Sequence, residues 1–304
     1  IAMDGVSEEK ALKKVLTDLK VNDVATTGVK YIGQDASISE GLQLMVDNNV
    51  SSVPIVDADQ KVVGVLDVLD VTYHLLQNTD VKYGDNPKIP KSYHFHKHKF
   101  SSVKAMDISN ISHRNQLVTV SGDETVAKAT VLLATKGTHR LFVVNDKEEL
   151  TGVISQMDIS KLFCKNIDSV SIGDKTLKEL KFGYCEVHRI LTTRPAYNGF
   201  KRLHEKNATG LAVVDATDGH TLVGSFSAAD IKVLGANPEE NHKKLEVPVS
   251  EYFDELKAAT SISQHKTLKD LAKTLEPAGT HRAFLIGDDE HATIIGVISL
   301  TDIV

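Results

Sequence analysis

The chain has 304 residues, of which 41% are apolar and 25% charged, with a net charge of -6. This composition predicts a globular protein of about two domains, and its scattered Lys and Arg argue against a nucleic-acid partner. No apolar stretch approaches the roughly 20 residues that cross a bilayer, and the start lacks an export signal, so no membrane partner is expected. The two cysteines form no disulfide or zinc pattern, which predicts a reducing compartment, the cytoplasm or the nucleus.

An amphipathic helix is predicted at the start, within residues 1–20. Ser7 suits its N-cap, and two glutamates follow in the first turn, where the helix dipole favours negative charge. The apolar residues that share one face of this helix are Leu12, Val15, Leu16 and Leu19. This helix is expected to precede the first repeat.

One motif then occurs four times along the chain. Each copy has a short β-type run, a helical pattern such as SISEGLQLMVDNN at 37–49, and two apolar runs joined by a polar turn, which predict a hairpin. The hairpins are VPIVDADQKVVGVLDVLDV, LFVVNDKEELTGVISQMDI, LAVVDATDGHTLVGSFSAADI and AFLIGDDEHATIIGVISLTDI, which begin at Val53, Leu141, Leu211 and Ala283. We refer to the four copies as units 1 to 4.

Each hairpin contains a glycine that is followed six residues later by an aspartate. The glycines are Gly64, Gly152, Gly224 and Gly296, and the aspartates are Asp70, Asp158, Asp230 and Asp302. The aspartates are spaced by 88, 72 and 72 residues, a regularity that chance explains poorly. A second helix should begin three residues before each aspartate, with N-caps at Asp67, Ser155, Ser227 and Ser299. Each unit is therefore predicted to be strand, helix, strand, strand, helix, an α/β fold.

A unit of this kind covers only one face of its sheet, so it should pair with a neighbour. The predicted organisation is a first pair over residues 21–165, a linker at 166–181 and a second pair over 182–304. An insertion at 78–104 explains the longer first spacing.

The insertion contains HFHKHKF, in which His94, His96 and His98 alternate. In an extended strand the three imidazoles would share one face, a spacing that can hold zinc or copper. The charges of Lys97 and Lys99 oppose a cation, however, and no Cys or acidic residue is adjacent. A solvated loop or a partner contact is the favoured interpretation, and no metal is expected.

The tetrapeptide GTHR occurs at 137–140 and again at 279–282, directly before the hairpins of units 2 and 4. Equivalent positions in a pseudo-symmetric assembly converge across an axis, so the two His-Arg pairs could face one anion. An arginine gives bidentate contact to phosphate, and a histidine adds a donor whose charge responds near neutral pH. The alternative is that Arg140 and Arg282 are ordinary surface cations at strand starts.

The repeated motif, VPIVD…GVL…D and GVIS with Asp-Ile three residues on, resembles cystathionine-β-synthase (CBS) domains in two tandem pairs. The two His-Arg pairs, with KFGYCEVHRILTTRPAY before the third hairpin, are similar to the gamma subunit of AMP-activated protein kinase. This resemblance implies four CBS units in a flat, pseudo-symmetric disc that binds AMP, ADP or ATP and needs no other cofactor. It also implies a non-enzymatic, energy-sensing subunit whose partners are protein kinase catalytic and scaffold subunits, or another regulated protein.

The resemblance further implies the site residues. The ribose hydroxyls would be bound by Asp70, Asp158, Asp230 and Asp302, the phosphates by His139, Arg140, Lys161, His281 and Arg282, and the pockets lined by Thr209, Ser227, Ser299 and Thr301. A carboxylate in the first turn of a helix can accept both ribose hydroxyls. The same Ser-x-x-Asp spacing also fits a capping box that only stabilises the helix start.

Unit 1 departs from the gamma pattern at two positions. Ser51 stands where gamma subunits commonly have an arginine, and Asp67 replaces the usual Ser or Thr, so two carboxylates would repel a phosphate at Asp70. In unit 2, Asp158 stands where animal gamma subunits often have an arginine. The alternative function is a standalone CBS scaffold that regulates a phosphatase or another partner without nucleotide. No nucleophile elbow, P-loop or zinc-protease motif is present, so no catalysis is expected.

Overall fold

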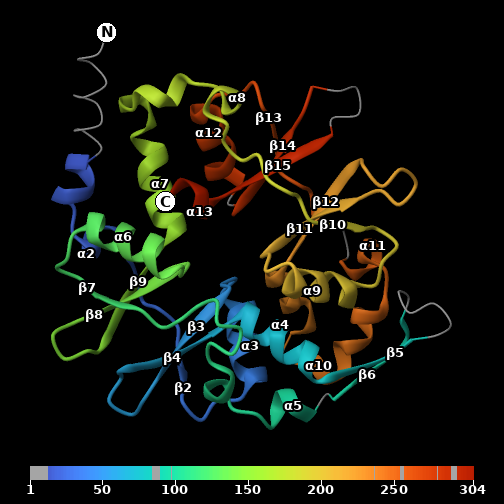
Figure 1. Ribbon diagram of the computed structural model, residues 1–304. Coiled ribbons are helices and arrows are strands. Elements are labelled where there is room, and N and C mark those ends of the chain that lie inside the picture. The colour runs from blue at the N-terminus through green and yellow to red at the C-terminus, as the bar shows by residue number, and fades with distance from the viewer. Residues whose placement is uncertain are drawn as a thin grey trace.

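The computed structural model describes residues 13–83, 90–96, 98–235, 237–253, 257–278, 280–288 and 293–304. These residues form four small mixed sheets around a common centre and one separate hairpin (Figure 1). Residues 13–18 are helical, as predicted, and the expected cap Ser7 lies outside the described residues. None of the described helices is both long and apolar enough to span a membrane.

All four units have the same strand order, in which the first strand is parallel to the second and the second antiparallel to the third. Unit 1 has β2 (Ile32–Gly33), α3 (Ile38–Asp47), β3 (Ser52–Val56), β4 (Val62–Asp67) and α4 (Val68–Gln77). Unit 2 has β7 (Thr119–Ser121), α6 (Val126–Lys136), β8 (Arg140–Val144), β9 (Leu150–Ser155) and α7 (Gln156–Lys165). Unit 3 has β10 (Arg189–Leu191), α9 (Ala196–Glu205), β11 (Gly210–Val214), β12 (Leu222–Ser227) and the 3-10 helix η4 (Ala228–Leu234). Unit 4 has β13 (Ser261–Ser263), α12 (Leu268–Ala278), β14 (Arg282–Ile286), β15 (Ile294–Ser299) and α13 (Leu300–Ile303).

Short elements connect the units. Before unit 1 lie α2 (Val21–Val24) and β1 (Thr26–Thr27), and the insertion contributes β5 (Thr79–Tyr83), β6 (Pro90–Phe95) and α5 (His98–Ser101). The others are η1 (Ala105–Ile108), η2 (Ile167–Ser169), η3 (Ser171–Asp174), α8 (Leu177–Leu180), α10 (Pro238–Asn241), η5 (His242–Glu246) and α11 (Val249–Tyr252). In the segment between the two pairs, Ile167 and Leu177 are buried in an apolar core, so this segment packs as part of the fold.

The predicted N-caps are confirmed in all four units. Asp67, Ser155, Ser227 and Ser299 have extended backbone and directly precede α4, α7, η4 and α13. The helix start is the place where unpaired backbone N–H groups need acceptors, and the Asp67 carboxylate accepts from the Leu69 N–H there at 2.9 Å.

The repeated glycines lie where a segment from outside the unit crosses the hairpin. A Cβ at Gly152 would lie 3.0 Å from the carbonyl oxygen of Thr26, which belongs to β1, and β1 pairs with β9. A Cβ at Gly296 would lie 2.0 Å from the carbonyl oxygen of Gly183. Only glycine allows such a close approach of another backbone, which explains its fixed place in the repeat.

The four units form a ring in the order 1, 2, 4, 3 (Figure 1). Units 1 and 2 meet at their hairpin turns, where the backbones of Lys61 and Glu149 form an isolated antiparallel β-bridge. Units 3 and 4 meet where the Arg189 side chain donates to the Ile294 carbonyl at 3.1 Å. Helix α4 packs on η4, and α7 packs on α12 and α13. Units 1 and 3, which are neighbours in the ring, share one large apolar core. This arrangement confirms the predicted pseudo-symmetric disc of two tandem pairs.

The insertion braces units 1 and 3. The Tyr93 hydroxyl donates to Asn198 Oδ1 of α9 at 2.9 Å, and the Phe95 ring stacks on His242 with centroids 5.6 Å apart. Its described residues therefore form a packed hairpin rather than the expected solvated loop, because Tyr93 and Phe95, which alternate along β6, both contact unit 3 and the segment after it.

The three histidines of the insertion do not continue as one strand. The rings of His94 and His96 lie 4.9 Å apart, and His96 Nε2 lies 2.9 Å from Asp80 Oδ2, but His98 already belongs to α5. Within the described ranges, no group of three His, Cys, Asp or Glu side chains is placed to hold a metal ion.

Candidate functional site

The two predicted His-Arg pairs meet at the centre of the ring. His139 and Arg140 stand at the start of β8, and His281 and Arg282 stand at the equivalent start of β14. The charges of Arg282 and Arg140 and the His139 ring all influence the pKa of His281, and Arg282 in turn influences His139. The four side chains therefore form one cluster, contributed equally by units 2 and 4.

Arg140 reaches from unit 2 into unit 1. Its Nη1 donates to the Ser52 hydroxyl, and its Nη2 lies 3.7 Å from Asp67 Oδ2. Asp67 is only 2% exposed, so this guanidinium is the cation that accompanies a buried carboxylate. Burial lowers the pKa of Arg140, and the charge of Asp67 opposes that shift.

Arg282 makes the equivalent reach from unit 4 into unit 3. Its Nη2 donates to the Thr209 hydroxyl at 3.2 Å, and its guanidinium covers Gly210, where a Cβ would lie 0.8 Å from Nη1. Burial lowers the pKa of Arg282 to about 10, against the charge of Asp230. The two arginines thus end beside the starts of β3 and β11, which are related by the pseudo-symmetry of the ring.

The pKa values of both histidines are lowered, so neither histidine has the charge that responds near neutral pH that the sequence predicted. Burial lowers the pKa of His281 to about 4, together with the neighbouring charges of Arg282 and Arg140. Because the His281 side chain is exposed, burial alone is a weak reason for the lowered pKa. Repulsion by the two arginine charges is the stronger reason. Burial and the same guanidinium groups lower the pKa of His139, although Asp67 opposes the shift. Near pH 7 each imidazole is therefore a neutral ring with one N–H to donate.

Two further cations belong to the cluster and were not predicted. Arg114 donates to the carbonyl oxygens of Ala208 at 3.1 Å and Asn207 at 3.0 Å, and its charge lowers the pKa of His139. Lys232 of η4 donates to Asn49 Oδ1 at 3.1 Å, and its charge acts on His281. The sequence signal for Arg114 is only a third His-Arg dipeptide, which no hairpin follows.

The other predicted phosphate and pocket residues take different places. Lys161 is exposed on α7 and takes no part in the contacts of the cluster described above. The Thr301 hydroxyl donates to Gln156 Oε1 at 3.1 Å and so joins the starts of α13 and α7. Ser227 and Ser299 serve as N-caps.

The aspartates of units 2 and 4 form capping boxes through only one of their two carboxylate oxygens. Asp158 Oδ2 accepts from the Ser155 N–H at 2.8 Å and from its hydroxyl at 2.7 Å. Asp302 Oδ2 accepts from the N–H and the hydroxyl of Ser299, each at 2.7 Å. In the part of the chain that the structure describes, no donor bonds the other oxygen of either carboxylate. The capping role is real, and it still leaves an acceptor for a ligand.

The aspartates of units 1 and 3 are occupied by the chain itself. Asp70 is fully buried and accepts from the Ser112 N–H at 3.0 Å, the Ser112 hydroxyl at 2.6 Å and the Asn110 N–H at 3.3 Å. Asp230 Oδ2 accepts from the Ser227 N–H at 2.5 Å, and its Oδ1 forms an ion pair with the Lys257 ammonium. In both units the extra donors come from the segment that leads into the next unit.

The buried carboxyl of Asp70 predicts a pH-dependent contribution to stability. Burial raises the pKa of Asp70 to about 6, although the hydrogen bonds from Ser112 oppose the shift. Between about pH 7 and pH 4 the folded state then binds more protons at this group than the unfolded state, so stability rises as pH falls. Relative to Asp70→Asn, the wild-type chain should gain about 2 kcal/mol between pH 7.5 and pH 4.5. Urea unfolding at both pH values, with exposed Asp123→Asn as control, measures this gain; a pH-independent difference between the chains would contradict it.

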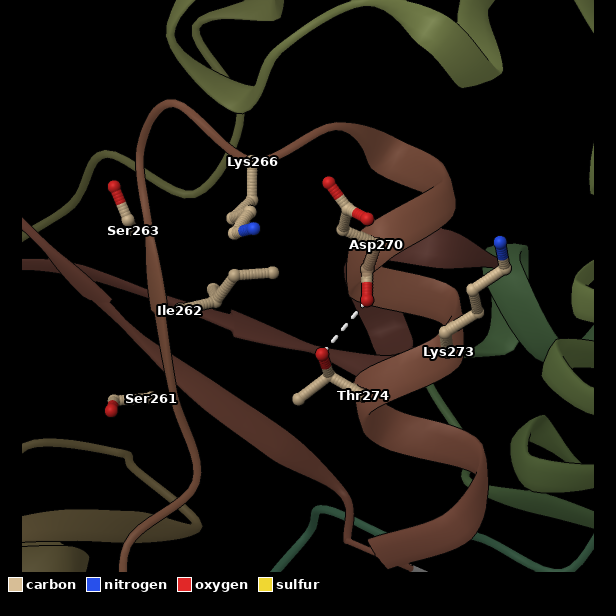
Figure 2. Close-up of a pocket in the computed structure, with 7 residues that line it drawn as sticks. All are labelled: Ser261, Ile262, Ser263, Lys266, Asp270, Lys273 and Thr274. Atoms are coloured by element: carbon tan, nitrogen blue, oxygen red, sulfur yellow. Dashed lines mark hydrogen bonds between the residues drawn. The ribbon is translucent and has the colours of Figure 1, made fainter.

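A surface cavity of about 320 Å3 lies away from this centre, between β13 and α12 of unit 4 (Figure 2). Lys266 and Lys273 flank Asp270 there, and the Thr274 hydroxyl donates to the Asp270 carbonyl at 2.8 Å. A backbone hydrogen bond from Thr267 and the two lysines lower the pKa of Asp270. The carboxylate offsets part of the lysine charge, and none of the predicted site residues lines this cavity.

Known proteins resemble the chain both in sequence and in fold. Protein SDS23 of Pyricularia oryzae is 26% identical over 228 residues, which cover 71% of this chain and 42% of that protein. Protein sds23/moc1 of Schizosaccharomyces pombe is 22% identical over 227 residues, which cover 71% of this chain and 54% of that protein. The chain therefore spans about half the length of these curated relatives or less.

Two solved structures share the whole four-unit arrangement. A protein from Methanocaldococcus jannaschii, described as a suggested archaeal homolog of g-AMPK, has a TM-score of 0.72 and 18% identity and covers 94% of this chain and 98% of its own. An uncharacterized conserved protein from Pyrococcus horikoshii has a TM-score of 0.54 and 18% identity, with coverages of 93% and 97%. At this identity the likeness concerns the fold.

A family model described as the CBS domain matches residues 21–77, 107–165 and 251–304, which together exceed half of the chain. Unit 3 lies outside these ranges, although its sheet has the same strand order as the others. Its hairpin reads LVGSFSAAD where units 2 and 4 have GVIS, and its last helix is a 3-10 helix. With its fold and its repeats accounted for, the chain belongs to the CBS-domain family.

Proposed function

We propose that this chain is a regulatory protein that binds AMP, ADP or ATP at the centre of its CBS disc and acts as the energy-sensing subunit of a protein kinase. The observation that carries the proposal is the proximity of Arg140 and Arg282, with His139 and His281, which come from equivalent positions of units 2 and 4. A phosphate between them would receive two guanidinium groups and two neutral imidazole N–H donors.

The charge balance of the centre favours an anion. Four cations gather there, and they share two buried carboxylates, those of Asp67 and Asp230. The cluster therefore has excess positive charge in a partly dehydrated place, where a phosphate gains more than it would in water. Titration of the folded chain with AMP, ADP and ATP tests the proposal.

The aspartates favour ribose binding at units 2 and 4. Asp158 and Asp302 each keep one oxygen that no described donor bonds, and a carboxylate oxygen is a suitable acceptor for ribose hydroxyls. At units 1 and 3, a ribose would first have to displace the donors that hold Asp70 and Asp230. We therefore expect fewer nucleotides per chain than the four that the repeat could offer.

The proposed kinase partner follows from similarity to other proteins. The proposal of a kinase follows the description of the Methanocaldococcus jannaschii protein and the similarity of the His-Arg pairs to gamma subunits. A second candidate is a CBS scaffold that regulates another partner without nucleotide, and the closed aspartates of units 1 and 3 favour it. Recovery of a kinase catalytic subunit with the tagged chain, in an AMP-dependent manner, would distinguish the two.

Gly210 offers a test that removes no charge. Gly210→Ala places a methyl group where the Arg282 guanidinium now lies, so the flexible side chain must leave while the backbone stays. We expect AMP binding to weaken about tenfold or more, with the free energy of unfolding changed by less than about 1 kcal/mol. Gly33→Ala, where nothing lies within 4 Å of the new Cβ, is the matched control in calorimetric titration. Unchanged AMP affinity in Gly210→Ala would place the phosphate away from Arg282.

A further inference from the structure

The carboxylate of Asp230 differs from the other three because a lysine holds it. Lys257, near the end of the segment that leads into unit 4, forms an ion pair with Asp230 Oδ1, while Ser227 donates to Oδ2. Asp230 is 1% exposed, so its charge depends on partners inside the protein. Both oxygens are engaged before any ligand arrives.

Lys257 is far more exposed than its partner Asp230. Its side chain is 52% exposed, and its ammonium lies 5.2 Å from the centre of the Phe253 ring. An exposed lysine on a flexible stem can exchange one anionic partner for another within a short reach. Asp230, in contrast, is fixed by the first turn of η4 and by its bond to Ser227.

The surroundings of this ion pair are rich in positive charge. Arg282 lies close enough for Asp230 to affect its pKa, and burial and the charge of Lys257 lower the pKa of Lys232. Three cations therefore share one carboxylate. If a ligand displaced Lys257 from Asp230 and brought no negative charge, the Lys257 ammonium would lose its counter-charge while two other cations remained nearby.

We propose that Lys257 makes the Asp230 pocket selective for phosphorylated ribosides over uncharged ones. Because Asp230 is almost fully buried, ribose hydroxyls can reach its Oδ1 only after Lys257 has left it. A nucleotide brings a phosphate that can accept the displaced ammonium, whereas adenosine brings none. This inference rests on the proposed function and names the residue that makes a phosphate a condition for entry at unit 3.

Unit 1 lacks this device. Asp70 is held by Ser112 and Asn110, which are neutral donors, so displacing them releases no cation. The requirement for a phosphate is therefore expected to be a property of unit 3. The difference between units 1 and 3 arises because the segment after each unit donates to its aspartate with different side chains, neutral in unit 1 and cationic in unit 3.

The test compares AMP with adenosine in calorimetric titrations of the whole chain. Lys257→Met should tighten adenosine binding about tenfold and narrow the preference for AMP by at least the same factor. The gain should vanish in the double variant Lys257→Met/Asp230→Asn, which locates it at this pocket. Lys266→Met, an exposed lysine of unit 4, should change neither affinity. If Lys257→Met does not fold, Lys257→Gln should move adenosine binding in the same direction.

The outcomes separate this inference from the proposed function. Weaker AMP binding with unchanged adenosine binding in Lys257→Met would make Lys257 a simple phosphate ligand and overturn the selection. Adenosine binding by Lys257→Met, when the wild-type chain binds neither compound, would overturn both the selection for a phosphate and the proposed function. Binding of neither compound by any folded variant would overturn both.

Discussion

Replacing Arg140 and Arg282 together with glutamine is expected to weaken AMP binding by a factor of about 100 or more. Each guanidinium offers charge-assisted hydrogen bonds to a phosphate, worth about 1.5–3 kcal/mol apiece, and 1.4 kcal/mol corresponds to a factor of ten. The two side chains reach the centre from different units, so neither can substitute for the other. Calorimetric titration of the folded variants measures the loss.

The control must separate binding from folding. Arg140→Gln leaves the buried Asp67 without its cation, so Arg140→Lys, which keeps the charge but loses the planar fork, should also weaken binding in a fully folded chain. Arg202→Gln removes an exposed arginine of α9 and should leave both the AMP affinity and the free energy of unfolding unchanged. An Arg140/Arg282 double variant that binds AMP like the wild type would contradict the assignment of the centre.

Gly296→Ala is expected to lower the free energy of unfolding by about 2–4 kcal/mol. The new Cβ would lie 2.0 Å from the Gly183 carbonyl oxygen, and the Val297 N–H donates to that same oxygen at 3.0 Å. The clash is with backbone, so the segment that crosses β15 must move and this bond must weaken. Urea unfolding measures the loss.

Gly33→Ala serves as the matched control for this substitution. A Cβ at Gly33 meets nothing within 4 Å, so its effect should stay within about 0.5 kcal/mol. Equal stability of Gly296→Ala and Gly33→Ala would show that the crossing segment does not require glycine. In that case the fixed glycine of the repeat would need another explanation.

The sequence predicted the features that depend on neighbouring residues. Alternating apolar runs around polar turns define the hairpins, and Ser155 or Ser299 three residues before an aspartate defines a helix start, because both patterns are local. The repeat then placed the His-Arg pairs at equivalent positions, and that equivalence was sufficient to predict their meeting. Unit 3 has the same strand order, but its last helix became a 3-10 helix that no local signal distinguished.

The features that the sequence did not predict depend on contacts between distant segments. Arg114 joins the centre through carbonyls 93 and 94 residues away, and Lys257 closes on an aspartate 27 residues before it. Lys161, which lies on the helix that follows a His-Arg hairpin, is exposed instead. The direction in which a long side chain turns is decided by packing of whole units, which residue spacing does not encode.

Calorimetric titration of the folded wild-type chain with AMP, with the thermal shift as a second readout, tests the central claim most directly. We expect saturable binding at micromolar AMP, with fewer than four nucleotides per chain. The melting temperature should rise as the AMP concentration increases. No heat and no thermal shift up to millimolar AMP, ADP or ATP, in a chain that unfolds cooperatively, would contradict it and leave the disc as a scaffold.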